Sequence, residues 1–283
     1  MKRIGSIIKG SLILLVGMAA VVLLLNGLTA QDSKENTLEK PIEKKSIHLV
    51  AIGDSLTQGV GDSQDAGGYV PRIQKKLTSL NSVKEVVADN YGVAGERSDE
   101  ILSRMTENEK MKNDLKTADI VVLTAGGNDI LQVFKKEKLA VSTDSFEKTL
   151  EDYRENLKTI LEQIHLQNTQ SQVYVFGLYN PYSAVFADVS EMKMILDEWN
   201  GSIDEIVSSD SQGTFLPIQT IFSQPKKQTK NLDTATSSEL QQYDATDNPY
   251  LYEKDLFHPN DAGYEKMTDV LFEAIQEKAA SKY

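Results

Sequence analysis

The sequence predicts an α/β domain with a parallel β-sheet that helices cover on both faces. Short apolar runs rich in β-branched residues alternate with longer segments whose apolar residues have helical spacing. The short runs are almost continuously apolar, as in strands that are buried on both faces of a sheet. The 283-residue chain is long enough for one such domain with a full core, and it contains no internal repeat.

The first expected strand shows this pattern: its run IHLVAIG has five apolar residues in six positions before Gly53. The expected strands are residues 47–53, 85–92, 119–127, 172–180 and 214–218. The expected helices are residues 69–80, 98–113, 145–167, 191–208 and 261–280. Residues 223–248 are polar without periodicity and are expected to form a long loop or insertion.

The first thirty residues have the layout of a signal peptide, with a basic start, a long apolar run and small polar residues before Gln31. Residues 10–28 carry no charge and are about long enough to span a bilayer, so an uncleaved membrane anchor is the alternative. A buried core helix fits this position poorly. We expect residues 31–46 to be a flexible charged linker and residues 47–283 to be the folded domain. That domain is expected to lie outside the cytoplasmic membrane, secreted or anchored.

Composition excludes several classes of function. The net charge is −12, and the first thirty residues are basic, which leaves −15 for the remainder. A body this acidic repels nucleic acid and does not adsorb to anionic lipid by charge, so solvation is the simplest explanation of the acidity. The chain has no cysteine, which excludes disulfides, thiolate metal sites and a lipidated N-terminal cysteine.

Ligands in open parallel sheets bind outside the carboxyl ends of the strands, and the sequence there is distinctive. The segments that follow the strands are GDS (53–55), YGVAGERS (91–98), AGGND (125–129) and YNPY (179–182). Glycines and small polar residues therefore gather at one edge of the sheet. Phe134, Leu139, Tyr179, Tyr182 and Phe186 are candidates to line an acyl pocket there, or else belong to the core. We expect its walls to be loops at residues 60–69, 128–143 and 223–248.

Ser55, at the end of the first strand, needs a base to become a nucleophile, and the usual base is histidine. The chain has three histidines. His48 is inside the first strand as a packed or edge imidazole, and His165 is near the end of a long helix as a surface residue. His258 lies in the loop before the last helix and is therefore the candidate base.

Asp255 precedes His258 by three residues, a spacing that lets a carboxylate fold back onto one ring nitrogen and leave the other free. Pro259 fixes the backbone after the histidine, and Asn260 or Asp261 can cap the last helix. The alternative is that DLFHPND is only a capped helix entrance. The serine at the strand end favours the chemical interpretation.

Four blocks, GDSLTQG, NYGVAGERS, GGND and DLFHPN, span residues 53–260. In sequence and order they resemble the SGNH hydrolases, also called GDSL esterases and lipases. The N-terminal segment, the acidic body and the ending EKDLFHPNDAGYEKM are similar to exported GDSL lipase-like proteins of Gram-positive bacteria.

The resemblance implies a three-layer α/β/α, flavodoxin-like SGNH hydrolase fold with a mostly five-stranded parallel sheet. It also implies roles: Ser55 as nucleophile, His258 as base and then acid, and Asp255 as the residue that orients His258. The oxyanion hole would consist of the Ser55 and Gly95 backbone N–H groups and the Asn128 side-chain amide. Turn geometry at Gly95 and a helix cap at Asn128 are alternatives that are compatible with these roles.

Other known sites do not match. No lysine follows the glycines of GDSLTQGVGD, so this is not a phosphate-binding loop, and GVGDSQ lacks the third glycine of a dinucleotide fingerprint. GDSLT is not the G-x-S-x-G elbow of α/β-hydrolases. No histidine pair has metal-ligand spacing, and we expect neither a metal nor a cofactor.

Three hypotheses about function follow. The first is a serine esterase or lipase that acts through an acyl-enzyme. The second keeps the site but acts as a carbohydrate O-acetyl esterase or as a cell-envelope acyltransferase. The third is a tethered binding module without turnover, against which the presence of all five site residues argues. The expected substrate is a small-molecule, lipid or carbohydrate ester.

Overall fold

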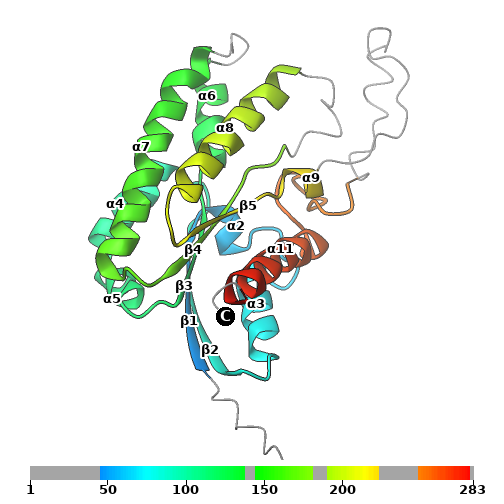
Figure 1. Cartoon of the computed structure of the whole chain (residues 1–283). Coiled ribbons are helices and arrows are strands. Elements are labelled where there is room, and N and C mark those ends of the chain that lie inside the picture. Colours follow the sequence, from blue (N-terminus) through cyan, green and yellow to red (C-terminus); the bar gives the residue numbers. More distant parts are fainter. Residues whose placement is uncertain (1–44, 138–143, 181–189, 223–247, 281–283) are drawn as a thin grey trace, which may run out of the picture. The chain divides into compact units, whose positions relative to one another are not determined.

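The computed structural model describes residues 45–137, 144–180, 190–222 and 248–280. At its centre is a five-stranded parallel sheet with the strand order β2-β1-β3-β4-β5 (Figure 1). The strands are β1 (Lys45–Gly53), β2 (Val83–Gly92), β3 (Ile120–Thr124), β4 (Gln172–Phe176) and β5 (Gly213–Leu216). The predicted parallel α/β fold class is thus confirmed.

Helices cover both faces of the sheet, as expected from the continuously apolar strands (Figure 1). Within β1, Val50 and Ile52 pack into one core cluster, and Leu49 and Ala51 pack into the other. The first face carries α4 (Ser98–Glu107), α5 (Glu109–Leu115), α6 (Gly127–Glu137), α7 (Asp144–Gln167) and α8 (Ser190–Ser208). The second face carries α3 (Tyr69–Thr78), α9 (Gln219–Phe222) and α11 (Asp261–Ala280).

The structure corrects two of the expected segments on the first face. Residues 98–113 form two helices rather than one, because Asn108 is extended and its side chain caps α5 by accepting from the Met111 N–H. Residues 128–143 were expected to be a loop, but α6 occupies the first part of this range. Ile130 and Val133, three residues apart, bury the core side of that helix.

The start of α11 matches one of the two predicted caps. The Asn260 side chain accepts from the Gly263 N–H at 3.0 Å. The Asp261 carboxylate does not cap the helix; it accepts hydrogen bonds from both the N–H and the hydroxyl of Ser63. The entrance to the last helix is therefore tied to the loop that follows the first strand.

Several expected features lie outside the described residues: the targeting segment (1–30), most of the linker (31–44) and most of the polar stretch (223–247). Lys45 and Ser46, which were assigned to the linker, already belong to β1. Among the helices of the described ranges, none is both long and apolar enough to cross a membrane.

Candidate active site

Ser55 is held at the carboxyl end of β1, an inner strand that pairs with β2 and β3. It is the first residue of the short helix α2 (Ser55–Gln58), which Asp54 caps by accepting from the Leu56 N–H at 3.0 Å. The approach of β1 to β3 requires glycine before this turn, since a Cβ at Gly53 would lie 2.2 Å from Thr124 Oγ1. Close packing of the two strands therefore fixes the position of Ser55, which is only 6% exposed.

The predicted base is next to this serine. His258 Nε2 lies 2.9 Å from Ser55 Oγ, and His258 Nδ1 lies 2.7 Å from Asp255 Oδ2. The carboxylate favours the tautomer with hydrogen on Nδ1, so that Nε2 is free to accept from the serine hydroxyl. The structure thus joins Ser55, His258 and Asp255 in one hydrogen-bonded chain.

Asp255 is ionised in this arrangement. Partial burial pushes its pKa up, but three hydrogen bonds outweigh that effect: one from the His258 ring and two from the Phe257 and His258 N–H groups. The net result is a pKa below the ordinary value for aspartate. The carboxylate can therefore orient the ring and stabilise an imidazolium.

The loop that carries His258 is fixed from several sides. Leu251 and Pro259 form an antiparallel bridge, and the Tyr252 N–H donates to the His258 carbonyl at 2.7 Å. The Tyr179 hydroxyl donates to the Phe257 carbonyl, also at 2.7 Å. Between Asp255 and His258, Leu256 has a φ of 54°, a conformation that is rare for a non-glycine residue and is retained where the surroundings enforce it.

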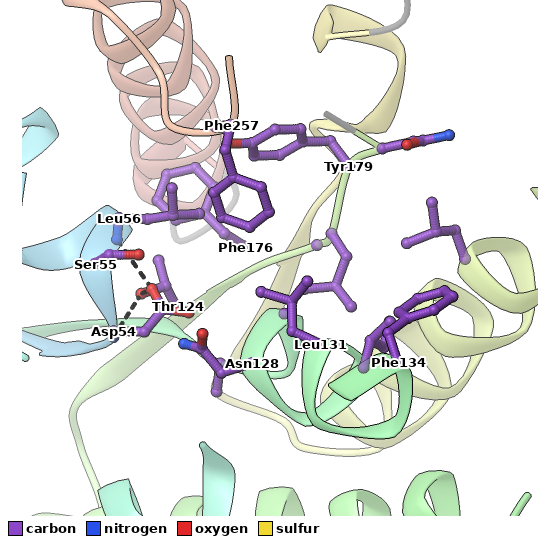
Figure 2. Close-up of a pocket in the computed structure, with 17 residues that line it drawn as sticks. Asp54, Ser55, Leu56, Thr124, Asn128, Leu131, Phe134, Phe176, Tyr179 and Phe257 are labelled. Carbon is purple, nitrogen blue, oxygen red and sulfur yellow. Dashed lines mark hydrogen bonds between the residues drawn. The ribbon is translucent and has the colours of Figure 1, made fainter. Parts of the chain in front are cut away.

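Two of the three expected oxyanion-hole residues line the same cavity. Ser55 and Asn128 both border it, and Figure 2 shows the two side chains near one another at one end. The Asn128 amide donates to the Glu96 carbonyl at 2.9 Å, which uses one of its two hydrogens. Gly95 does not line the cavity, but its φ of 88° requires glycine on backbone grounds, and no atom lies within 4 Å of a Cβ built there.

The cavity has a volume of about 490 Å³ and walls that are mainly apolar. Four of its polar side chains, Ser55, Asp54, Thr124 and Asn128, are grouped at one end, and Phe134 lies at a distance from them (Figure 2); Asn180 also lines the cavity. The other apolar lining side chains are Leu56, Ala125, Ile130, Leu131, Phe176, Leu178, Tyr179, Leu196 and Phe257. Of the predicted pocket residues, Phe134 and Tyr179 line the cavity, and Leu139, Tyr182 and Phe186 lie outside the described residues.

A buried polar network under Ser55 was not predicted. Thr124 Oγ1 donates to Asp54 Oδ1 at 2.8 Å, and Thr57 Oγ1 lies 2.8 Å from both Thr124 Oγ1 and the Tyr69 hydroxyl. Burial raises the pKa of Asp54 even though the Leu56 N–H and the Thr124 hydroxyl oppose that rise. The signal in the sequence was a threonine at the end of a core strand, directly before the AGGND segment.

The other two histidines lie away from the site. His48 hydrogen-bonds to Thr117 and Asp89 from β1, which has a neighbouring strand on each side, so it is the packed imidazole of the two alternatives expected. His165 was expected at the surface, but it is partly buried, with Nε2 2.6 Å from Asp210 Oδ2. Among the described residues, no group of histidine and carboxylate side chains could hold a metal ion.

Residues 51–266 match the GDSL-like Lipase/Acylhydrolase family, and the chain belongs to this family. The chain is an ester hydrolase, as the resemblance of its four blocks implied.

Two relatives from Bacillus match most of the chain. The uncharacterized protein YpmR of Bacillus subtilis (strain 168) is 28% identical over 268 residues, which cover 94% of this chain and 96% of that protein. The spore germination lipase LipC of Bacillus licheniformis is 28% identical over 231 residues, which cover 80% of this chain and 95% of that protein. These relatives agree with the expected Gram-positive subgroup.

Solved structures share the fold. The lipase Lip_vut3 from a goat rumen metagenome superposes with a TM-score of 0.61 at 24% identity, covering 81% of this chain and 97% of that one. The acetyl xylan esterase AlAXEase superposes with a TM-score of 0.55 at 18% identity, covering 81% of this chain and 100% of that one. At these identities the likeness establishes the architecture alone.

Proposed function

We propose that the chain hydrolyses carboxylic esters through an acyl-enzyme on Ser55, and that the cavity beside Ser55 binds an apolar acyl chain. One observation carries this proposal. The hydrogen-bonded chain from Asp255 through His258 to Ser55 ends at the polar end of a cavity whose other walls are mainly apolar, with Asn180 as a further polar lining residue.

In the first half of the reaction Ser55 Oγ attacks the ester carbonyl carbon and its proton passes to His258 Nε2. The tetrahedral intermediate then expels the alcohol, which takes the proton from His258 as the carbon–oxygen bond breaks. In the second half a water molecule attacks the acyl carbonyl and gives a proton to His258. Ser55 leaves with that proton, and the carboxylic acid is released.

Negative charge develops on the carbonyl oxygen in both halves, so donors must be aimed at it. The second hydrogen of the Asn128 amide and the N–H groups of Ser55 and Gly95 are the proposed donors. An amide stays neutral at any working pH and can donate throughout. Asp255 stays ionised and compensates the imidazolium that forms in each half.

The shape and chemistry of the cavity favour an apolar acyl chain over acetyl. An acetyl group would leave most of the space between Asn128 and Phe134 unfilled. Each methylene that is buried there in the transition state stabilises that state by about 0.8 kcal/mol, which raises kcat/KM roughly fourfold. A carbohydrate acetyl esterase would gain nothing from these walls.

A graded series of p-nitrophenyl esters, from acetate through butyrate and octanoate to dodecanoate, tests this proposal beside acetylated xylo-oligosaccharides. We expect kcat/KM to rise from acetate to a medium-length chain and then to level off. The Ser55→Ala variant should be inactive on every ester. A maximum at acetate, or a preference for the acetylated sugars, would contradict the proposed acyl specificity.

A further inference from the structure

One partly buried ion pair lies next to the proposed oxyanion hole and plays no part in the mechanism above. It joins Arg104 on α4 to Glu96, the residue that follows Gly95. Arg104 Nε lies 3.0 Å and 2.9 Å from the two Glu96 carboxylate oxygens, and Arg104 Nη2 donates to one of them at 2.6 Å. The side chains are only 19% and 17% exposed.

Both partners of this pair also contact the segments that carry the site. The Glu96 carbonyl accepts from the Asn128 amide, and Arg104 Nη2 donates to the Gly53 carbonyl at 3.3 Å. The same Gly53 carbonyl accepts from the Val93 N–H at 2.9 Å. The pair therefore connects the turn before Ser55, the Gly95 loop and the start of α6.

A second contact holds α4 to α6 independently of the ion pair. The Ser98 N–H and hydroxyl donate to the two carboxylate oxygens of Asp129 at 3.0 and 2.6 Å. The base of α4 is thus fixed to the helix that carries Asn128. Because α4 is fixed at Ser98, the position of Arg104 on the same helix is also fixed, and its ion pair can restrain Glu96.

We propose that the Arg104–Glu96 pair positions the oxyanion donors, with Glu96 holding the Asn128 amide through its carbonyl and the Gly95 N–H through its place in the loop. This inference rests on the proposed function. Neither side chain lines the cavity, so both are positioning residues rather than catalytic ones. On one side of Gly95 the Ala94 N–H donates to the Gln58 side chain at 2.6 Å, and on the other side the ion pair supplies the constraint at Glu96.

The test compares Glu96→Gln, Arg104→Met and the double variant with wild type on p-nitrophenyl octanoate. Displacement of a donor by a fraction of an ångström should lower kcat on the order of 10–100-fold and leave KM within about twofold. Because the two residues act as one unit, the double variant should lose about as much as either single variant. Arg104→Lys, which cannot make the two-point contact, should recover only part of the rate.

Arg154→Met is the control for loss of an interhelical ion pair away from the site, because Arg154 pairs with the more exposed Glu205 at 2.9 Å between α7 and α8. It should leave kcat unchanged. Active-site titration with a fluorophosphonate gives the concentration of folded, reactive enzyme in each variant. Dividing each rate by this concentration gives a kcat that does not depend on how much of Arg104→Met or Glu96→Gln is unfolded.

Three outcomes separate the inference from the function on which it rests. Wild-type kcat in Glu96→Gln, with Ser55→Ala inactive, would overturn the positioning role alone. Activity in Ser55→Ala would overturn the proposed function. Losses in the two single variants that multiply in the double variant would show that the residues act separately, which also contradicts the proposal.

Discussion

Ser55 and His258 are 203 residues apart in the sequence, yet Ser55 Oγ lies 2.9 Å from His258 Nε2. The parallel sheet brings them together. Ser55 follows β1 at the carboxyl edge of the sheet, and the bridged loop before α11 places His258 over that same edge.

Asp255→Asn should lower kcat by about 10²–10⁴-fold. The asparagine oxygen can still accept from the backbone N–H groups of residues 257 and 258, which turns its NH₂ toward His258 Nδ1. The ring must then accept at Nδ1 and carry its hydrogen on Nε2, where it cannot take the proton of Ser55. Steady-state kinetics on a p-nitrophenyl ester measures the loss, with Asp152→Asn, a surface aspartate paired to Lys148, as the control that should stay active.

The same variant has an expected effect on stability. The pKa of Asp255 is lowered in the folded protein, so its contribution is present above the ordinary aspartate pKa of about 4 and is lost as the pH falls through the lower folded value. Wild type should therefore melt higher than Asp255→Asn at neutral pH, and the difference should shrink in acid. A difference that grows as the pH falls would contradict this assignment.

Asn128→Ala should lower kcat by about 10²–10³-fold with a small change in KM, because one donor to the transition state is lost. The variant also loses the bond to the Glu96 carbonyl. Asn168→Ala is matched to it, since Asn168 donates to the Ala118 carbonyl at 3.0 Å, near the start of β3. Both variants should lose about 1 kcal/mol of stability. Equal kcat in the two variants would exclude the proposed role of Asn128.

Leu131→Trp should shorten the acyl chains that the enzyme accepts. Leu131 lines the cavity between Asn128 and Phe134, so a larger side chain fills space that the proposal assigns to the acyl chain beyond its carbonyl (Figure 2). The ratio of kcat/KM for octanoate to that for acetate should fall at least tenfold, at about fourfold for each excluded methylene. The rate on acetate serves as the internal control and should change little. An unchanged ratio would place the acyl chain elsewhere.

Asp54→Asn should become more stable relative to wild type as the pH rises. Burial raises the pKa of Asp54, so its favourable contribution is complete below the ordinary value of about 4 and is lost as the pH rises through the folded value. Asparagine can still accept from Leu56 and Thr124 without a buried charge. Urea unfolding at mildly acidic and at neutral pH compares the two proteins. A stability difference that does not vary with pH would show that Asp54 carries no unfavourable charge.

The sequence predicted strand positions and site residues well where a single physical rule determines the residue type. The strands β3 and β4 are buried throughout and β1 from Leu49 on, so their continuous apolar runs located them, whereas the outer strands β2 and β5 gave only short apolar runs. The chemistry of serine and histidine pointed to Ser55 and His258. Sequence reasoning was less informative at the first turn of α6, where glycines and Asn128 belong both to a site and to a helix. The apolar spacing of Ile130 and Val133 was the available signal for that helix.

Contacts that depend on how elements dock could not be read from the sequence. Arg104 meets Glu96 only because the chain turns between residues 93 and 97 and α4 then runs back past the loop. His165 was expected at the surface, but docking brings it against Asp210, 45 residues further along the chain. In each case the residue types were visible, whereas the pairing required the tertiary structure.

The most direct measurement of the central claim is mass spectrometry of the protein after rapid quenching with p-nitrophenyl octanoate, followed by peptide mapping. We expect an octanoyl adduct on Ser55 in the wild-type protein when it is quenched with the ester still in excess, and none in Ser55→Ala. An adduct on another residue, or undiminished turnover by a folded Ser55→Ala protein, would contradict the central claim.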